Sequence, residues 1–280
     1  MKLAFSTNAF TRFPLADAIA AIKEAGYAGV EILADVPHAY PEQIDSAFTS
    51  AVAKSLETSG LEVSNINCNC SFGYWKDAPP EPYFEPSLIS PNKQHRDDRA
   101  RLIMKTLDFA RDIGARNISI TSGRTLGSMT PAKAADQFKT EILPILDHAN
   151  ANGVDVGIEC EPGLFLEWTE ELRQWIDQLC HPRLGANLDI GHSQVLGESI
   201  PGAVRLLAER IWNLHVEDIP GRKHYHMIPG EGTLDWVGLR DALWDIKYDR
   251  FATVELYTHT EDPHGAARRS YEFLSRLFGA

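Results

Sequence analysis

The chain has 280 residues, enough for one large domain or two small ones, and its 44% hydrophobic and 24% charged residues exclude a disordered protein. The formal net charge of −12 would repel a phosphate backbone, so no nucleic-acid partner is expected. MKLAFSTNAF has no leader-like apolar core, and no apolar run approaches the ~20 residues that cross a bilayer, so we expect a cytoplasmic protein without a membrane partner.

Short β-branched, apolar runs alternate with amphipathic stretches from one end of the chain to the other. The first run, KLAFS, is followed by a helical stretch that stops at Gly26. Strands are predicted at 2–6, 29–33, 61–68, 115–122, 154–160, 183–190, 210–218 and 251–257. Helices are predicted at 15–25, 42–59, 96–113, 131–153, 169–179, 201–208, 234–246 and 263–278.

Repeated strand–helix units imply parallel strands joined by right-handed crossovers. Eight units with no segment left over predict an α/β fold, a single (β/α)8 TIM-barrel domain over residues 1–280. A doubly wound open sheet is the alternative, but such a sheet usually has a glycine-rich turn after its first strand, and STNAFTRF lacks the GxGxxG pattern. A long polar, proline-rich loop is predicted at about 72–94, and its composition suggests a lid or an oligomer contact.

The predicted strands of the second half end in side chains that can bind a metal. In a TIM barrel the carboxyl ends of the strands line the active site. Four such residues lie at this rim, one in each of four successive segments. They are Glu159 in IECEPG, Asp189 in NLDIGHS, His215 in NLHVED and Glu255 in TVELYTH. Three crowded carboxylates repel one another unless a cation intervenes, and mixed oxygen and nitrogen ligands suit Mn, Mg, Co or Zn. We therefore expect one divalent ion, with Mn as the first choice because none of the four expected ligands is a thiolate.

Other polar residues lie close to these four in the sequence. Asp189 by itself could be a simple turn former, but its coincidence with the other three favours a metal ligand. Glu161 and His192 follow the same strand ends and are expected to contact substrate. In the loop DIPGRKHYHMIPGEGTLDW, His226 is expected to contact substrate or a second metal, whereas His224 could equally well be solvated.

These segments resemble the xylose isomerase-like superfamily of sugar isomerases and epimerases and, less closely, its endonuclease IV branch. IECEPG and TVEL are similar to its two metal-glutamate segments, NLDIGHS to its aspartate segment with a histidine three residues later, and NLHVED to its metal-histidine segment. The resemblance runs along the whole chain and is sharpest over 154–257. It implies a TIM barrel, one divalent metal ion and a small carbohydrate substrate.

The resemblance also implies a reaction. A metal-dependent isomerase or epimerase removes a proton next to a carbonyl and passes through an enediolate. Glu159 or Glu255 would remove the proton; in epimerisation the other would return it on the opposite face, and in isomerisation the same base would return it to the neighbouring carbon. His192 would hydrogen-bond a substrate oxygen. The ketose epimerases of the family have an arginine where this chain has His226, so the chain departs from them at this position.

Three other functions stay open at this point. A dehydratase acting on a polyol or keto-sugar would use the same metal and base. An endonuclease IV-like phosphodiesterase would need histidines after the early strands, where this chain has Asn67 and Thr121–Ser122, so a trinuclear zinc cluster is not expected. A non-catalytic sugar-binding barrel would not need two facing bases. A homo-oligomer is neither required nor excluded by the sequence.

Overall fold

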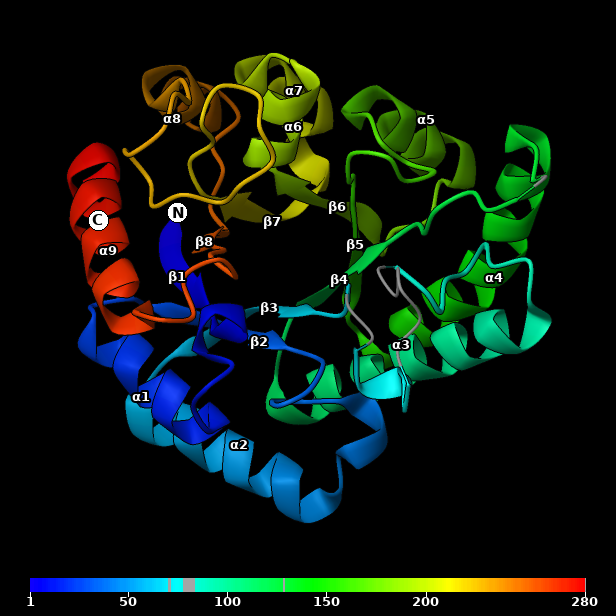
Figure 1. Ribbon diagram of the computed structural model, residues 1–280, viewed down its shortest axis with the longest axis horizontal. Coiled ribbons are helices and arrows are strands. Elements are labelled where there is room, and N and C mark those ends of the chain that lie inside the picture. The colour runs from blue at the N-terminus through cyan, green and yellow to red at the C-terminus, as the bar shows by residue number, and fades with distance from the viewer. Residues whose placement is uncertain (70–71, 78–83, 128, 280) are drawn as a thin grey trace.

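The computed structural model describes residues 1–69, 72–77, 84–127 and 129–279, so residues 78–83 of the predicted loop lie outside the described residues. Eight parallel strands close into a barrel in chain order, and the helices form a ring around it (Figure 1), which confirms the predicted TIM barrel. The strands are β1 (Lys2–Ser6), β2 (Gly29–Leu33), β3 (Glu62–Asn67), β4 (Asn117–Thr121), β5 (Asp155–Glu159), β6 (Leu184–Asp189), β7 (Ile211–Val216) and β8 (Phe251–Val254).

The described helices, with one exception, correspond to helices that the sequence predicts. They are α1 (Leu15–Glu24), α2 (Ser46–Ser59), α3 (Lys93–Ile113), α4 (Pro131–Asn152), α5 (Thr169–Leu179), α6 (Ile190–Leu196), α7 (Ile200–Leu207), α8 (Trp236–Asp245) and α9 (Pro263–Phe278). Within the described ranges, no helix has both the length and the apolar character that a membrane span requires.

Capping side chains account for two helix starts that differ from the prediction. Helix α2 begins after Asp45, whose carboxylate accepts a hydrogen bond from the backbone N–H of Phe48, and residues 41–43 form a separate 3-10 turn. Helix α3 begins after Asn92, which accepts from the backbone N–H of Gln94, three residues earlier than predicted. In both cases the capping residue decides the boundary, because its side chain satisfies an N–H that the helix leaves unpaired.

Closure of the barrel places the end of β8 beside the end of β1. Phe5 of β1 pairs with Val254, so residue 255 lies directly beyond the strand at the rim. In the neighbouring pair of β6 and β7, Asp189 pairs with His215. Side chains from distant parts of the sequence therefore meet at one end of the barrel.

Helix α6 is a short helix that the sequence analysis does not predict. It follows β6 without a loop, because the Asp189 carboxylate accepts a hydrogen bond from the backbone N–H of His192 (2.8 Å) and caps the first turn. It ends at Gly197, which has a φ of 82°, a value that glycine adopts without strain. His192 is consequently held on a helix and not on a mobile loop.

Candidate active site

The structure brings the four predicted metal ligands together at the carboxyl ends of β5 to β8. One ligand atom from each of Glu159, Asp189, His215 and Glu255 lies within 4.8 Å of the other three, and all four residues are buried. Three carboxylates in a buried space repel one another strongly. The arrangement therefore calls for a positive charge at its centre.

His215 is oriented by a buried carboxylate from the opposite side of the barrel. Its Nε2 lies 2.6 Å from Oε2 of Glu31, which also accepts from the Asn65 amide (2.7 Å). Nδ1 therefore faces the cluster, 3.3 Å from Glu159 and 3.7 Å from Glu255. Burial alone would lower the pKa of His215, but the carboxylates of Glu31 and Glu255 raise it well above its ordinary value. A carboxylate–imidazole pair of this kind fixes the ring for metal binding.

Two amides hold one carboxylate oxygen of Glu159, and the other oxygen lies on the side of His192. Its Oε2 accepts hydrogen bonds from the Asn69 amide (2.8 Å) and from the Asn187 amide. Its Oε1 lies 3.8 Å from Nδ1 of His192. The two amides fix the carboxylate plane, which leaves the second oxygen in a defined position.

Glu255 repeats this arrangement from the other side of the site. Its Oε1 accepts from the amides of Asn8 (3.0 Å) and Asn67 (2.9 Å), and its Oε2 lies 3.7 Å from Nδ1 of His215. Burial raises the pKa of Glu255 well above its ordinary value, and the Glu159 carboxylate adds to the rise although His215 opposes it. A cation would reverse this effect, because a bound positive charge favours the ionised carboxylate.

Asp189 provides the clearest sign that a cation fits. Its Oδ1 caps α6, but its buried Oδ2 has no hydrogen-bond partner in the described structure. Buried polar atoms are rarely left unpaired, and three carboxylates with one imidazole form a ligand set that suits Mn, Mg, Co or Zn. The residues present therefore fit a divalent metal.

A further buried carboxyl, Glu217, lies behind Asp189. Burial raises its pKa well above the ordinary value, and the neighbouring Asp189 carboxylate raises it further. Its carboxyl packs so closely on Gly191 that a Cβ built on this glycine would lie 1.9 Å from Oε1 of Glu217. The glycine of the NLDIGHS segment thus makes room for this carboxyl.

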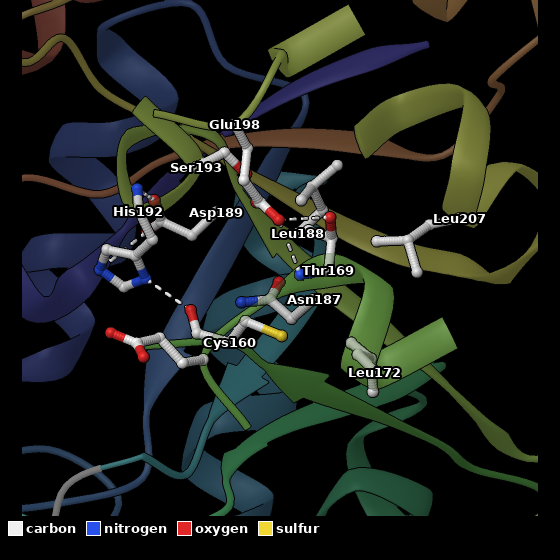
Figure 2. A pocket seen from close by; sticks show the side chains of 11 residues that line it. Cys160, Thr169, Leu172, Asn187, Leu188, Asp189, His192, Ser193, Glu198 and Leu207 are labelled. Atoms are coloured by element: carbon white, nitrogen blue, oxygen red, sulfur yellow. Dashed lines mark hydrogen bonds and ion pairs between the residues drawn. The ribbon is translucent and has the colours of Figure 1, made fainter. Parts of the chain in front are cut away.

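His192 and Glu161 form a charged pair at the edge of the cluster. Nδ1 of His192 lies 2.9 Å from the backbone oxygen of Cys160, and Nε2 lies 3.3 Å from Glu161 (Figure 2 shows His192 beside Cys160 and Asp189). Burial alone would lower the pKa of His192, but Asp189 and Glu161 raise it to about 9. Burial raises the pKa of Glu161 to about 7, although His192 opposes this. Both groups can exchange protons with a ligand near neutral pH.

The helix that carries His192 is tied to the loop after β5. Behind the histidine lies a pocket of about 10 Å³, where Glu198 accepts from the backbone N–H (3.0 Å) and hydroxyl (2.8 Å) of Thr169. The same carboxylate accepts from the hydroxyl of Ser193 (3.0 Å; Figure 2). Glu198 therefore connects the start of α5 to α6 and holds His192 in place relative to the loop.

His226 and His224 lie at the same site. Nδ1 of His226 lies 2.9 Å from the backbone oxygen of Glu255, and its buried Nε2 has no partner among the described residues. Burial lowers the pKa of His226 to about 3, so the ring is neutral. His224 is partly exposed, and its Nδ1 lies 3.7 Å from Glu161. All the predicted substrate-binding residues therefore lie around the four predicted metal ligands.

Glu159, Glu255 and the residues expected to bind substrate line a cavity of about 590 Å³ at the carboxyl end of the barrel, where the active sites of this fold lie. Its described lining residues are Asn8, Thr11, Leu33, Asp35, Val36, Asn67, Asn69, Phe72, Phe84, Arg124, Glu159, Glu161, Pro162, His192, His224, His226, Glu255, Tyr257 and Thr260.

Several residues of the site are missed by the sequence analysis. Glu31 lies within β2, and Asn8 and Asn69 follow the ends of the first and third strands. Asn67 was noted only because it stands where the endonuclease IV branch has a histidine. Glu217 lies two residues beyond a predicted metal ligand, His215. Asn8 and Asn69 could have been found from their place just after strand ends in the first half of the chain, whereas Glu31 lies inside a strand and has no such signal.

Comparison with known proteins agrees with the TIM-barrel fold. The family described as xylose isomerase-like TIM barrel matches residues 19–277. Fructoselysine 3-epimerase of Shigella flexneri is 23% identical over 283 positions, which cover 99% of this chain and 98% of that protein. Among solved structures, a D-tagatose 3-epimerase-like protein is similar with a TM-score of 0.83, 18% identity and coverage of 100% and 97% of the two chains. The IOLI protein with a zinc atom has a TM-score of 0.81, 15% identity and coverage of 100% and 98%. The chain therefore belongs to the xylose isomerase-like TIM barrel family.

Proposed function

We propose that the protein is a metal-dependent isomerase or epimerase of a small carbohydrate that acts by removing a proton next to a carbonyl. One observation carries this proposal. Glu159 and Glu255 line one cavity from the ends of two different strands, and in each residue two amides hold one carboxylate oxygen and leave the other free of them. The sugar epimerases among the similar proteins support a carbohydrate substrate.

A divalent metal ion fits the centre of this site. Glu159, Asp189, His215 and Glu255 would hold it, with Mn as the first choice and Mg, Co or Zn as alternatives. When bound, the ion would polarise the substrate carbonyl and acidify the neighbouring C–H. A similar solved structure is described as binding a zinc atom, which is consistent with a metal ion in this family.

Two glutamates that line one cavity and come from the ends of different strands suit the transfer of a proton between the faces of a carbon atom. Glu159 or Glu255 takes the proton from the carbon next to the carbonyl through its oxygen that the amides do not hold. In epimerisation the other glutamate returns a proton to the opposite face, whereas in isomerisation the first returns it to the adjacent carbon. The paired amides keep each carboxylate in the orientation that this transfer requires.

The remaining polar groups can bind and orient the sugar. His192 is held by Cys160 and can donate to a substrate oxygen through Nε2, next to Glu161. His226 is neutral, and its unpartnered Nε2 can accept from a sugar hydroxyl. Glu161, His192 and His226 are therefore proposed as substrate-binding residues.

Solvent-deuterium exchange tests the proposal directly. The protein is stripped of metal, reloaded with Mn²⁺ and incubated in D2O with a panel of ketoses and aldoses, and NMR follows deuterium at each carbon. We expect deuterium beside the carbonyl, dependent on metal and absent with the stripped protein. A lack of exchange with every sugar under metal loading would refute proton abstraction.

The same experiment separates the related activities. A dehydratase would release water and give a deoxy-keto product after the same exchange, which mass spectrometry detects as a loss of mass. A phosphodiesterase would cleave bis(4-nitrophenyl) phosphate without any exchange. Among the described residues that line the cavity, carboxylates outnumber lysine and arginine side chains, which does not favour an anionic phosphodiester.

A further inference from the structure

We propose that the substrate is an unphosphorylated sugar with an apolar, aromatic-sized substituent, which packs on a rigid apolar wall facing the acidic cluster across the cavity. The wall consists of Leu33, Val36, Phe72 and Phe84. The inference rests on the proposed function for the sugar end of the ligand. It adds that the other end of the ligand is an apolar substituent.

The apolar wall and the acidic cluster occupy opposite sides of the barrel mouth. Leu33 and Val36 lie at and after the end of β2, and Phe72 and Phe84 lie in the loop after β3. The acidic cluster comes from β5 to β8, and in a closed barrel of eight strands β2 and β3 face β6 and β7. A ligand held by the cluster at one end therefore extends toward the wall at the other.

Two side chains of the wall are exposed although they line a cavity. Phe72 is 46% exposed and Val36 is 36% exposed. Large apolar side chains gathered at the mouth of a polar cavity are typical of a ligand-binding surface, because water contact with them is unfavourable until a ligand covers them. A free sugar, which carries a hydroxyl on nearly every carbon, would gain little from this surface.

The wall is held in place by a buried carboxylate. Asp35 is only 1% exposed, and it accepts hydrogen bonds from the backbone N–H groups of Val36 (2.8 Å), Phe72 (2.6 Å) and Gly73 (2.8 Å). A Cβ built on Gly73 would lie 3.0 Å from Cγ1 of Val36, so the turn after β3 packs directly on the loop after β2. The backbone that carries Val36 and Phe72 is thus held in place, which lowers the entropic cost of binding a ligand against these two side chains.

The charges of the cavity disfavour a phosphorylated sugar. Four carboxylates line it, from Asp35, Glu159, Glu161 and Glu255. Among the described lining residues, these carboxylates face a single arginine, Arg124, and no lysine. A phosphate group would therefore meet more carboxylates than permanently charged cationic side chains, in a chain with a net charge of −12.

The size of the cavity points to the same class of ligand. Its volume is about 590 Å³, within the range of roughly 300–1,000 Å³ that holds drug-sized ligands. A single free sugar bound at the acidic cluster would leave the side with the apolar wall to water. A substituent on the sugar would fill this side and cover Phe72.

Matched ketoses test the proposal on the Mn²⁺-loaded protein. The probes are D-fructose, D-fructose 6-phosphate, 1-anilino-1-deoxy-D-fructose and 6-O-benzyl-D-fructose, so that the phenyl group is offered at either end of the sugar. Calorimetry gives Kd, and deuterium exchange gives kcat/KM. We expect at least one arylated ketose to exceed D-fructose by about tenfold or more in both measures, and the phosphate to fall below D-fructose. Equal values for the arylated and free ketoses, or a preference for the phosphate, would overturn the proposal.

Two variants locate the effect. Phe72→Ala should reduce the ratio of arylated to free ketose affinity by about fivefold. Trp244→Ala removes another exposed aromatic residue that does not line the cavity, and it should leave the ratio unchanged. An unchanged ratio in Phe72→Ala would show that the wall does not bind the substituent. If an arylated ketose binds tightly but no ketose exchanges deuterium, the proposed reaction fails, and only the binding of the substituent by the wall stands.

Discussion

Replacing Glu31 with glutamine is expected to weaken divalent metal binding by about tenfold. Oε2 of Glu31 accepts from both Nε2 of His215 (2.6 Å) and the Asn65 amide (2.7 Å), and a glutamine oxygen at this position can keep both contacts. The change therefore removes the charge and keeps the shape. Hydrogen bonds to charged groups contribute ~1.5–3 kcal/mol and neutral ones ~0.5–1.5 kcal/mol, and the difference of about 1–1.5 kcal/mol corresponds to roughly tenfold in affinity.

Glu31→Ala should have a larger effect, toward about 100-fold, because it also removes the group that orients the His215 ring. The measurement is Mn²⁺ affinity of the metal-free protein by competition with a fluorescent chelator, and circular dichroism confirms folding of each variant. Glu62→Gln is the control, because this exposed carboxylate at the start of β3 pairs with Lys2 at the surface. Wild-type Mn²⁺ affinity in folded Glu31→Ala would refute metal binding through Nδ1 of His215.

Three further predictions follow from individual contacts of the site. Glu255→Gln should reduce deuterium exchange by about 100-fold or more with the fold intact, and NMR showing retained turnover would exclude Glu255 as an essential base. The pKa of Glu161 is raised from 4.5 to about 7, so the folded metal-free protein keeps a proton that the unfolded chain releases, and its unfolding free energy should fall as pH rises from about 5 to 7. Glu161→Gln should lose this pH dependence, which melting temperatures at pH 5 and 8 would reveal; identical slopes would contradict it. Gly191→Ala should destabilise the protein by about 1–3 kcal/mol in urea unfolding, because its Cβ would overlap with Glu217; an unchanged midpoint would show that the carboxyl can move away.

The fold and the core of the site are visible in the sequence because strand periodicity is local. Alternating strands and helices predict parallel strands, and parallel strands end at the same rim, so residues at successive strand ends become neighbours. Asp189 and His215, for example, pair directly between β6 and β7. Helix α6 is missed because its seven residues are too few for a helical period to stand out.

The partners that orient these residues depend on closure of the barrel. The Asn8 amide reaches Glu255 across 247 positions of sequence, and Glu31 reaches His215 across 184. An asparagine or a glutamate within a strand has no local pattern that names its partner, because the partner lies on another strand at a position set by the register of the whole sheet. The sequence alone therefore determined which residues reach the rim, and the tertiary structure decided which oxygen of each glutamate is held and which nitrogen of His215 faces the site.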